Sequence, residues 1–145
     1  MRAVSSTQED YNLHPFFFFT ETLDLMQNLN LVGSLPNGIG RCLNLKFLRL
    51  FYNDITGTIP EDLFLIDKLE SVIIHNTLMT GSLPTKYKDL SRLNRLSVGF
   101  DIFTGTFPQW ISHCRELVYL RGAFSNFHGQ LPDLANLTKL QIGKS

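Results

Sequence analysis

Histidine is the side chain in this sequence best suited to acid–base chemistry at neutral pH, and the chain contains four histidines. They are His14, His75, His113 and His128. Only His75 has candidate catalytic partners, because Asp54 and Ser97 fall at nearby places in the repeat described below. A hydrolytic Ser/His/Asp arrangement would also need an oxyanion hole and a strained nucleophile turn, and short strands supply neither. We therefore predict that the protein is not an enzyme and that His75 contacts a ligand or solvent.

Phosphate, metal and nucleic-acid chemistry are not indicated either. The glycines never form a GxGxxG or GxxxxGK loop, and the two cysteines lack the spacing of a zinc knuckle. The 13 Lys and Arg residues balance 13 Asp and Glu and form no cluster, so we expect no nucleic-acid partner. No apolar run reaches the ~18 residues of a membrane-spanning helix, and the N-terminus lacks the features of a secretory signal. We expect no cofactor, no metal and no membrane contact by this segment.

A repeat of 24 residues organises the sequence. The tetrapeptide Gly-x-(Leu/Ile/Phe)-Pro occurs five times at this spacing, beginning at Gly33, Gly57, Gly81, Gly105 and Gly129. With the glycine at position 10, apolar residues fill positions 8, 12, 16 and 22. Positions 12 and 16 hold Leu35, Ile59, Leu83, Phe107 and Leu131, then Ile39, Leu63, Tyr87, Ile111 and Ala135. One unit cannot bury such a face alone, so we expect stacked units with one continuous core that includes Phe103, Phe107 and Phe127.

Each unit is expected to begin with a short strand and to return through a helical turn. Apolar and exposed residues alternate in residues 48–50, 72–74 and 96–98, which predicts strands with one face inward. Residues 61–69 and 109–117 follow a proline and carry apolar residues three apart, as in a short helix or 3₁₀ turn. The predicted fold class is an α/β solenoid, with a short-stranded parallel sheet on its concave face and helical turns on its convex face.

These units resemble the plant-type leucine-rich repeat, whose pattern is LxxLxLxxNxLxGxIPxxLxxLxxL. The repeat from Leu45 to Leu69 matches it best, and the resemblance covers about residues 23–142. The Gly-x-Ile-Pro variant looks like the extracellular part of plant receptor-like kinases and receptor-like proteins, and like polygalacturonase-inhibitor-like proteins. Residues 114–140 resemble receptor-like kinases that carry a malectin-like domain. The resemblance implies a right-handed coil and a location on the extracellular side of the plasma membrane or in the apoplast.

The resemblance also implies a function, namely non-catalytic recognition of a peptide, protein or cell-wall-derived ligand, with a co-receptor as a further partner. Two alternatives stay open. One is a secreted inhibitor of a cell-wall-degrading enzyme, similar to polygalacturonase inhibitors, and the other is a truncated repeat fragment without its own ligand. The sequon Asn136-Leu137-Thr138 makes Asn136 a predicted glycosylation site, which fits an extracellular location.

The candidate ligand-binding residues lie at positions 2, 4 and 5 of the repeats, where the family presents ligand contacts on the concave face. They are Arg49, Phe51, Tyr52, His75, Asn76, Phe100, Arg121 and Phe124. Exposed aromatic residues with arginine are typical of recognition hot spots. We expect a ridge of aromatic side chains at position 5, with a shallow trough beside it at Gly99 and Ala123. The alternative is that these rings only cover neighbouring strands.

The two ends of the repeat array depart from the pattern. Residues 1–22 are a predicted N-terminal flank, either cap-like or disordered, and residues 23–145 form the repeat domain, whose last repeat is irregular. Two registers compete in the first repeat, and a one-residue bulge between Asn28 and Leu31 would reconcile them. The family's asparagine column reads Leu29, Asn53, Thr77, Asp101 and Ser125. Because a leucine cannot make the hydrogen bonds of this column, the first coil is expected to be looser.

Both cysteines are expected to be free, buried thiols. Cys42 and Cys114 fall at position 19, an apolar column that they share with Ile66 and Leu90. They lie three repeats apart, which is on the order of 14 Å at ~4.8 Å per strand. This separation exceeds the ~7 Å limit between the Cα atoms of a disulfide.

Overall fold

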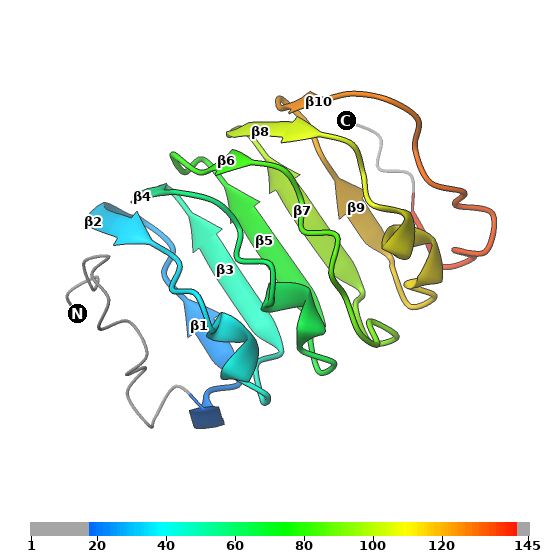
Figure 1. Ribbon diagram of the computed structural model, residues 1–145, viewed down its shortest axis with the longest axis horizontal. Coiled ribbons are helices and arrows are strands. Elements are labelled where there is room, and N and C mark those ends of the chain that lie inside the picture. Colours follow the sequence, from blue (N-terminus) through cyan, green and yellow to red (C-terminus); the bar gives the residue numbers. More distant parts are fainter. Residues whose placement is uncertain (1–17, 142–145) are drawn as a thin grey trace.

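The computed structural model describes residues 18–141 as a solenoid of stacked coils (Figure 1). One five-stranded sheet runs along it, in the order β1-β3-β5-β7-β9. Its strands are β1 (Thr22–Asp24), β3 (Phe47–Phe51), β5 (Ser71–His75), β7 (Arg95–Gly99) and β9 (Tyr119–Arg121). All four pairings are parallel, and from β3 onward each residue pairs with the residue 24 positions later. The predicted parallel sheet and its period are therefore confirmed.

A second set of strands follows the main strands and forms a second edge of the solenoid. β2 (Asn28–Ser34) pairs with β4 (Asn53–Thr56), and β6 (Thr80–Gly81), β8 (Ile102–Gly105) and β10 (Asn126–Phe127) form a three-stranded sheet. The repeated glycine then turns the chain. Gly81 has a φ of +87°, and a Cβ there would lie 2.9 Å from Thr58 Cγ2 of the preceding coil. Glycine is needed for both reasons, the left-handed backbone and the close approach between coils.

The convex side carries 3₁₀ helices in three of the described coils. These are η2 (Ile39–Arg41), η3 (Leu63–Leu65) and η4 (Gln109–His113). The helical turn predicted after every proline is wrong for residues 82–90 and for residues 133–141, neither of which has a helix. The first of these segments lies between two helical coils. In this segment the amide of Lys88 donates to the carbonyl oxygen of Phe64 in the neighbouring coil, at 3.1 Å. The segment is therefore bonded to its neighbour rather than coiled on itself.

The core runs through the solenoid beneath the main sheet. The inward residues of β3, β5 and β7 are fully buried, and they are Leu48, Leu50, Val72, Ile74, Leu96 and Val98. Phe103 is also fully buried, whereas Phe107 and Phe127 are only partly buried and pack against the core. Cys42 and Cys114 are buried and unpaired with each other, as predicted.

Two predicted core columns contain exposed residues. Tyr87 at position 16 is 40% exposed, and Phe64 and Trp110 fill the interior near it with ring centroids 4.7 Å apart. Leu131 at position 12 is also exposed. In the last repeat Leu137 is buried instead, because the chain reaches its leucines early after Pro132. Ala135, at position 16 of the last repeat, is exposed as well. The expectation that Tyr87, Leu131 and Ala135 belong to the core is wrong.

The first coil contains the predicted irregularity. Leu23 pairs with Leu48, 25 residues later, and the register of β2 against β4 shifts between Asn28 and Val32. Asn28, not Leu29, pairs with Asn53, and its Nδ2 donates to the carbonyl oxygens of Leu25 and Met26 at 2.9 and 3.0 Å. The asparagine column therefore includes Asn28, and Leu29 points into solvent at 69% exposure.

Most of the predicted N-terminal flank, residues 1–17, lies outside the described residues. Within the described part, Asn44 Nδ2 donates to the carbonyl oxygen of Phe18 at 3.3 Å. No helix of residues 18–141 is long and apolar enough to cross a lipid bilayer.

Candidate functional site

The candidate site is built at the C-terminal ends of the main strands. Phe51 and His75 end β3 and β5, and they pair directly across the sheet. The next position in four coils has a left-handed backbone, with φ of 57°, 53°, 55° and 56° at Tyr52, Asn76, Phe100 and Phe124. Asparagine tolerates this conformation, whereas a bulky aromatic residue there is strained. The recurring turn places the side chains of successive coils beside one another.

The aromatic side chains at these positions form a continuous row of ring contacts, which we call the aromatic row. Its members are Phe51, Tyr52, His75, Phe100 and Phe124. The ring of Phe51 stacks on His75 with centroids 5.1 Å apart, and His75 meets Phe100 edge-on at 6.3 Å. Phe100 stacks on Phe124 at 4.5 Å. Tyr52 contacts both Phe51 and His75 edge-on, at 5.9 and 6.5 Å. The row therefore crosses four consecutive coils without a break.

Arg121 adds a positive charge to the aromatic row. Its guanidinium carbon lies 4.9 Å from the centroid of the Phe100 ring, in a cation–π contact. No carboxylate among residues 18–141 forms an ion pair with it. Arg49 is arranged differently, because its guanidinium donates to Asp24 Oδ2 at 3.1 Å and lies 5.9 Å from the Phe47 ring. The structure thus places Arg121 in contact with the aromatic row, whereas Arg49 contacts Asp24 and Phe47 instead.

His75 is held as a neutral ring. Burial lowers its pKa, and Arg121 lowers it further, while Asp101 acts in the opposite direction. Asn76 Nδ2 lies 3.1 Å from His75 Nδ1, and because an amide nitrogen can only donate, Nδ1 accepts and the ring proton is assigned to Nε2. At neutral pH the aromatic row is therefore uncharged except at Arg121.

Asp101 supports the turn next to the aromatic row. It stands in the asparagine column, where its Oδ1 accepts hydrogen bonds from the amide and the hydroxyl of Thr77, at 2.6 and 2.8 Å. Its Oδ2 is buried without a hydrogen-bond partner in the described structure. Burial raises the pKa of Asp101 despite the hydrogen bonds from Thr77, which lower it. The carboxylate thus links two coils at some cost in stability.

One sequence expectation about this face, the trough beside the ridge, is not met. Gly99 leaves no trough, because it is buried and a Cβ there would collide with the carbonyl oxygen of Ala123. Ser97 is buried at 4% exposure, and the described hydrogen bonds do not link it, or Asp54, to His75. The Ser/His/Asp arrangement that could be written from the sequence is therefore not assembled.

The face also contains a cation–π pair that was not predicted from the sequence. Arg95 begins β7 and lies with its guanidinium carbon 5.1 Å from the ring centroid of Tyr119 in β9. Arg95 stands directly before the predicted strand 96–98, and Tyr119 is the equivalent residue of the next repeat. A strand predicted to begin one residue earlier would have included this position. Beyond the aromatic row, Leu78 and Ile102 are exposed at position 7 of neighbouring coils. Exposed apolar and aromatic side chains therefore gather along this edge of the sheet.

The sequence of one coil matches a known repeat family. Residues 44–65 match the model of the Leucine Rich Repeat, and the solenoid with its parallel sheet has the corresponding architecture. The chain has the leucine-rich-repeat fold. Over 37 residues it is 49% identical to phytosulfokine receptor 1 of Arabidopsis thaliana, a match that covers 26% of this chain and 4% of that receptor.

Solved structures of plant receptor ectodomains are similar to this chain. The ectodomain of the Arabidopsis receptor kinase HAESA, in complex with an N-terminally extended IDA peptide hormone ligand, aligns with a TM-score of 0.77 and 28% identity over 83% of this chain. The ectodomain of GASSHO1/SCHENGEN3 from Arabidopsis thaliana, in complex with CASPARIAN STRIP INTEGRITY FACTOR 2, aligns at 0.75 with 30% identity over 83%. The chain spans only 20% and 14% of those two chains.

Proposed function

We propose that this chain is a non-catalytic recognition module that binds an extended peptide or protein segment across the aromatic row. The observation that carries the proposal is the unbroken series of ring contacts from Phe51 to Phe124, with Arg121 stacked on it. Aromatic and arginine side chains that remain partly exposed are characteristic of binding hot spots. The two ectodomains named above were solved in complex with an IDA peptide hormone ligand and with CASPARIAN STRIP INTEGRITY FACTOR 2, and the extracellular location of ectodomains supports an extracellular role for this chain.

The dimensions of the aromatic row suit a short extended segment. Neighbouring parallel strands lie ~4.8 Å apart, so four coils span about 14 Å. An extended chain covers ~3.4 Å per residue, and the row would therefore contact about four ligand residues. The neutral rings favour apolar ligand side chains, whereas Arg121 favours one carboxylate or backbone carbonyl at the end of the row. Asn136, the predicted glycosylation site, is exposed in the last coil.

Selection from a phage-displayed library of random heptapeptides, followed by calorimetry with the selected peptides, tests the proposal. Phe100→Ala and Arg121→Ala should each weaken binding by about 1 kcal/mol or more. Lys88→Ala is the matched control, because Lys88 is exposed and belongs to the convex segment of another coil. Equal binding by all three variants would exclude the aromatic row as the binding surface.

A further inference from the structure

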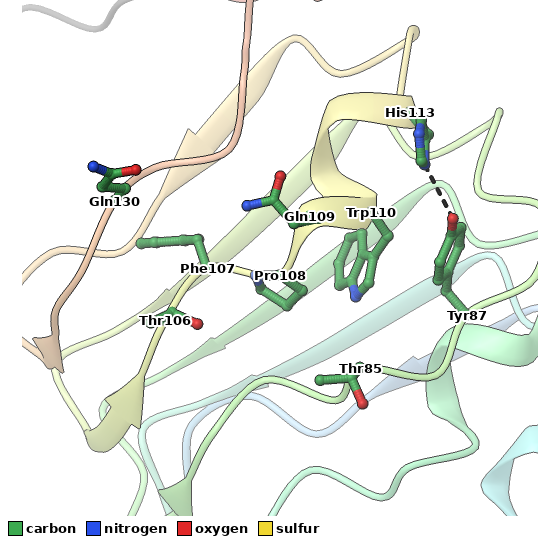
Figure 2. Close-up of a pocket in the computed structure, with 9 residues that line it drawn as sticks. All are labelled: Thr85, Tyr87, Thr106, Phe107, Pro108, Gln109, Trp110, His113 and Gln130. Carbon is green, nitrogen blue, oxygen red and sulfur yellow. Dashed lines mark hydrogen bonds between the residues drawn. The ribbon is translucent and has the colours of Figure 1, made fainter.

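A hollow lies on the convex side of the solenoid, apart from the aromatic row. It is a pocket of about 590 Å³ that three successive coils line (Figure 2). Thr85 and Tyr87 come from one coil, residues 106–110 and His113 from the next, and Gln130 from the third. Its volume falls within the ~300–1,000 Å³ of small-molecule sites. No residue of the aromatic row lines it, so it is a separate surface.

The pocket exists because residues 82–90 lack the 3₁₀ helix of the neighbouring coils. Tyr87 stands where those coils bury Ile39, Leu63 or Ile111, and it remains at the surface instead. A phenol would lose the hydration of its hydroxyl in that apolar column, and the space is already filled by Phe64 and Trp110. The extended segment therefore leaves a hollow beside η4.

The walls of this hollow are fixed by specific contacts. The indole nitrogen of Trp110 donates to the carbonyl oxygen of Pro84 at 2.9 Å, which ties η4 to the preceding coil. Tyr87 and His113 stack with centroids 5.9 Å apart, and the tyrosine hydroxyl lies 3.1 Å from His113 Nδ1 (Figure 2). Phe107 packs on Phe127 at 4.7 Å. The apolar walls are thus in place before any ligand arrives.

Four polar side chains around the hollow are uncharged and form no hydrogen bonds within the described structure. Thr85 and Thr106 supply hydroxyl groups, and Gln109 and Gln130 supply amides that both donate and accept hydrogen bonds. The side chains of these four residues are exposed and make no hydrogen bond to another described residue. Among residues 18–141, no Asp, Glu, Lys or Arg lines the pocket. Its two titratable groups, Tyr87 and His113, contact each other.

We propose that this pocket binds a short neutral oligosaccharide. A sugar ring presents apolar C–H faces, which suit Phe107, Pro108 and Tyr87, and a rim of hydroxyl groups that donate and accept, which suits the amides and threonines. An acidic sugar would bring a carboxylate into a site without a cation to pair with it, and would lose hydration without compensation. The site therefore selects a neutral sugar over an acidic one.

Saturation-transfer NMR and calorimetry on the full chain test this proposal. The probes are cellotetraose, xylotetraose and mannotetraose as neutral sugars, and tetragalacturonate as an acidic sugar of equal length. At least one neutral tetrasaccharide should bind, and tetragalacturonate should bind at least about tenfold more weakly. The double variant Gln109→Ala/Gln130→Ala should weaken binding of the neutral sugar at least about tenfold, through the loss of two hydrogen-bonding amides.

Three further variants distinguish this site from simple loss of structure and from the aromatic row. Thr85→Trp should fill the hollow from an exposed position and abolish sugar binding, whereas Lys86→Ala, next to it but outside the lining, should bind like the parent chain. Phe100→Ala should also leave sugar binding unchanged, because it alters only the aromatic row. The proposal is overturned if no neutral tetrasaccharide binds, if tetragalacturonate binds equally well, or if Thr85→Trp has no effect.

Discussion

The guanidinium carbon of Arg121 lies 4.9 Å from the centre of the Phe100 ring, although the two residues belong to different coils of the solenoid. Phe100 in turn stacks on Phe124, which follows Arg121 by three residues in the chain. One ring is therefore held by two residues of the next coil. This contact is possible because the 24-residue period brings equivalent positions of successive coils together, and it joins the charge of Arg121 to the aromatic row.

The core assignment predicts a large loss of stability for Phe103→Ala. Phe103 is fully buried, and removal of its ring should leave a cavity that lowers the free energy of unfolding by about 3–5 kcal/mol. Ile102→Ala is the control, because Ile102 precedes it in the chain and is 56% exposed. The control should change stability by less than about 1 kcal/mol in urea denaturation. Equal midpoints for the two variants would contradict the assignment.

Because the backbone at residue 124 is left-handed, we expect the residue type there to affect stability although the side chain is exposed. Phe124 has a φ of 56° and is 77% exposed. Phe124→Asn and Phe124→Val both remove the stacking on Phe100, but asparagine tolerates this backbone and a β-branched valine does not. The asparagine variant should be more stable than the valine variant by about 1 kcal/mol in chemical denaturation. A more stable valine variant would rule out a strained turn.

Asp101→Asn should stabilise the protein at neutral pH. The folded pKa of Asp101 lies above its ordinary value, so the folded state holds this proton more tightly than the unfolded chain does. Stability is therefore lost as the pH rises from the ordinary aspartate pKa through the folded pKa. An asparagine keeps the acceptor for Thr77 and avoids the buried charge, and we expect a gain of about 1 kcal/mol at pH 7.

The pH dependence of this gain is its control. The difference between Asp101→Asn and the parent chain should shrink as the pH falls below the folded pKa, where Asp101 is protonated. Stability curves measured by urea denaturation from pH 3 to pH 8 would show this convergence. A gain that stays constant over the whole range would mean that the charge of Asp101 is not its cause.

The two thiols should be unreactive in the folded state. Burial raises the pKa of Cys114 to about 12, and burial, with a smaller effect of Asp62, also raises the pKa of Cys42. Ellman's reagent at pH 8 should therefore titrate neither thiol of the native protein and both thiols of the denatured, unreduced monomer. A denatured monomer without free thiols would show a disulfide and overturn the register of the coils.

Much of the fold follows from the period of the sequence. A repeat of 24 residues sets the register of a parallel sheet directly, which is why the pairings of Leu48 with Val72 and of Val72 with Leu96 could be predicted. The position of the aromatic row follows from the same period. Its ring-to-ring contacts do not, because they depend on the left-handed backbone at Tyr52, Phe100 and Phe124, where aromatic residues are uncommon.

The predictions fail where residues of one repeat occupy space that the pattern assigns to another repeat. Tyr87 is not in the core, because Phe64 and Trp110 of neighbouring coils occupy the space near it. This arrangement involves residues of three coils, so a comparison of one repeat position at a time does not detect it. Similarly, the absence of a side chain at Gly99 leaves no empty space, because the backbone at Ala123 occupies that position. Close packing fills a vacancy from whichever neighbour can reach it.

Contact between a ligand and the aromatic row can be measured directly by isotope-edited NOE spectroscopy of a selected heptapeptide bound to the protein. We expect NOEs from the peptide to ring protons of Phe100 and Phe124, and to the side chain of Arg121. These NOEs should be absent with Phe100→Ala at the same protein concentration, whereas Lys88→Ala on the convex side should retain the fold and the peptide contacts. NOEs confined to convex residues such as Tyr87, with none to Phe100 or Phe124, would contradict the claim.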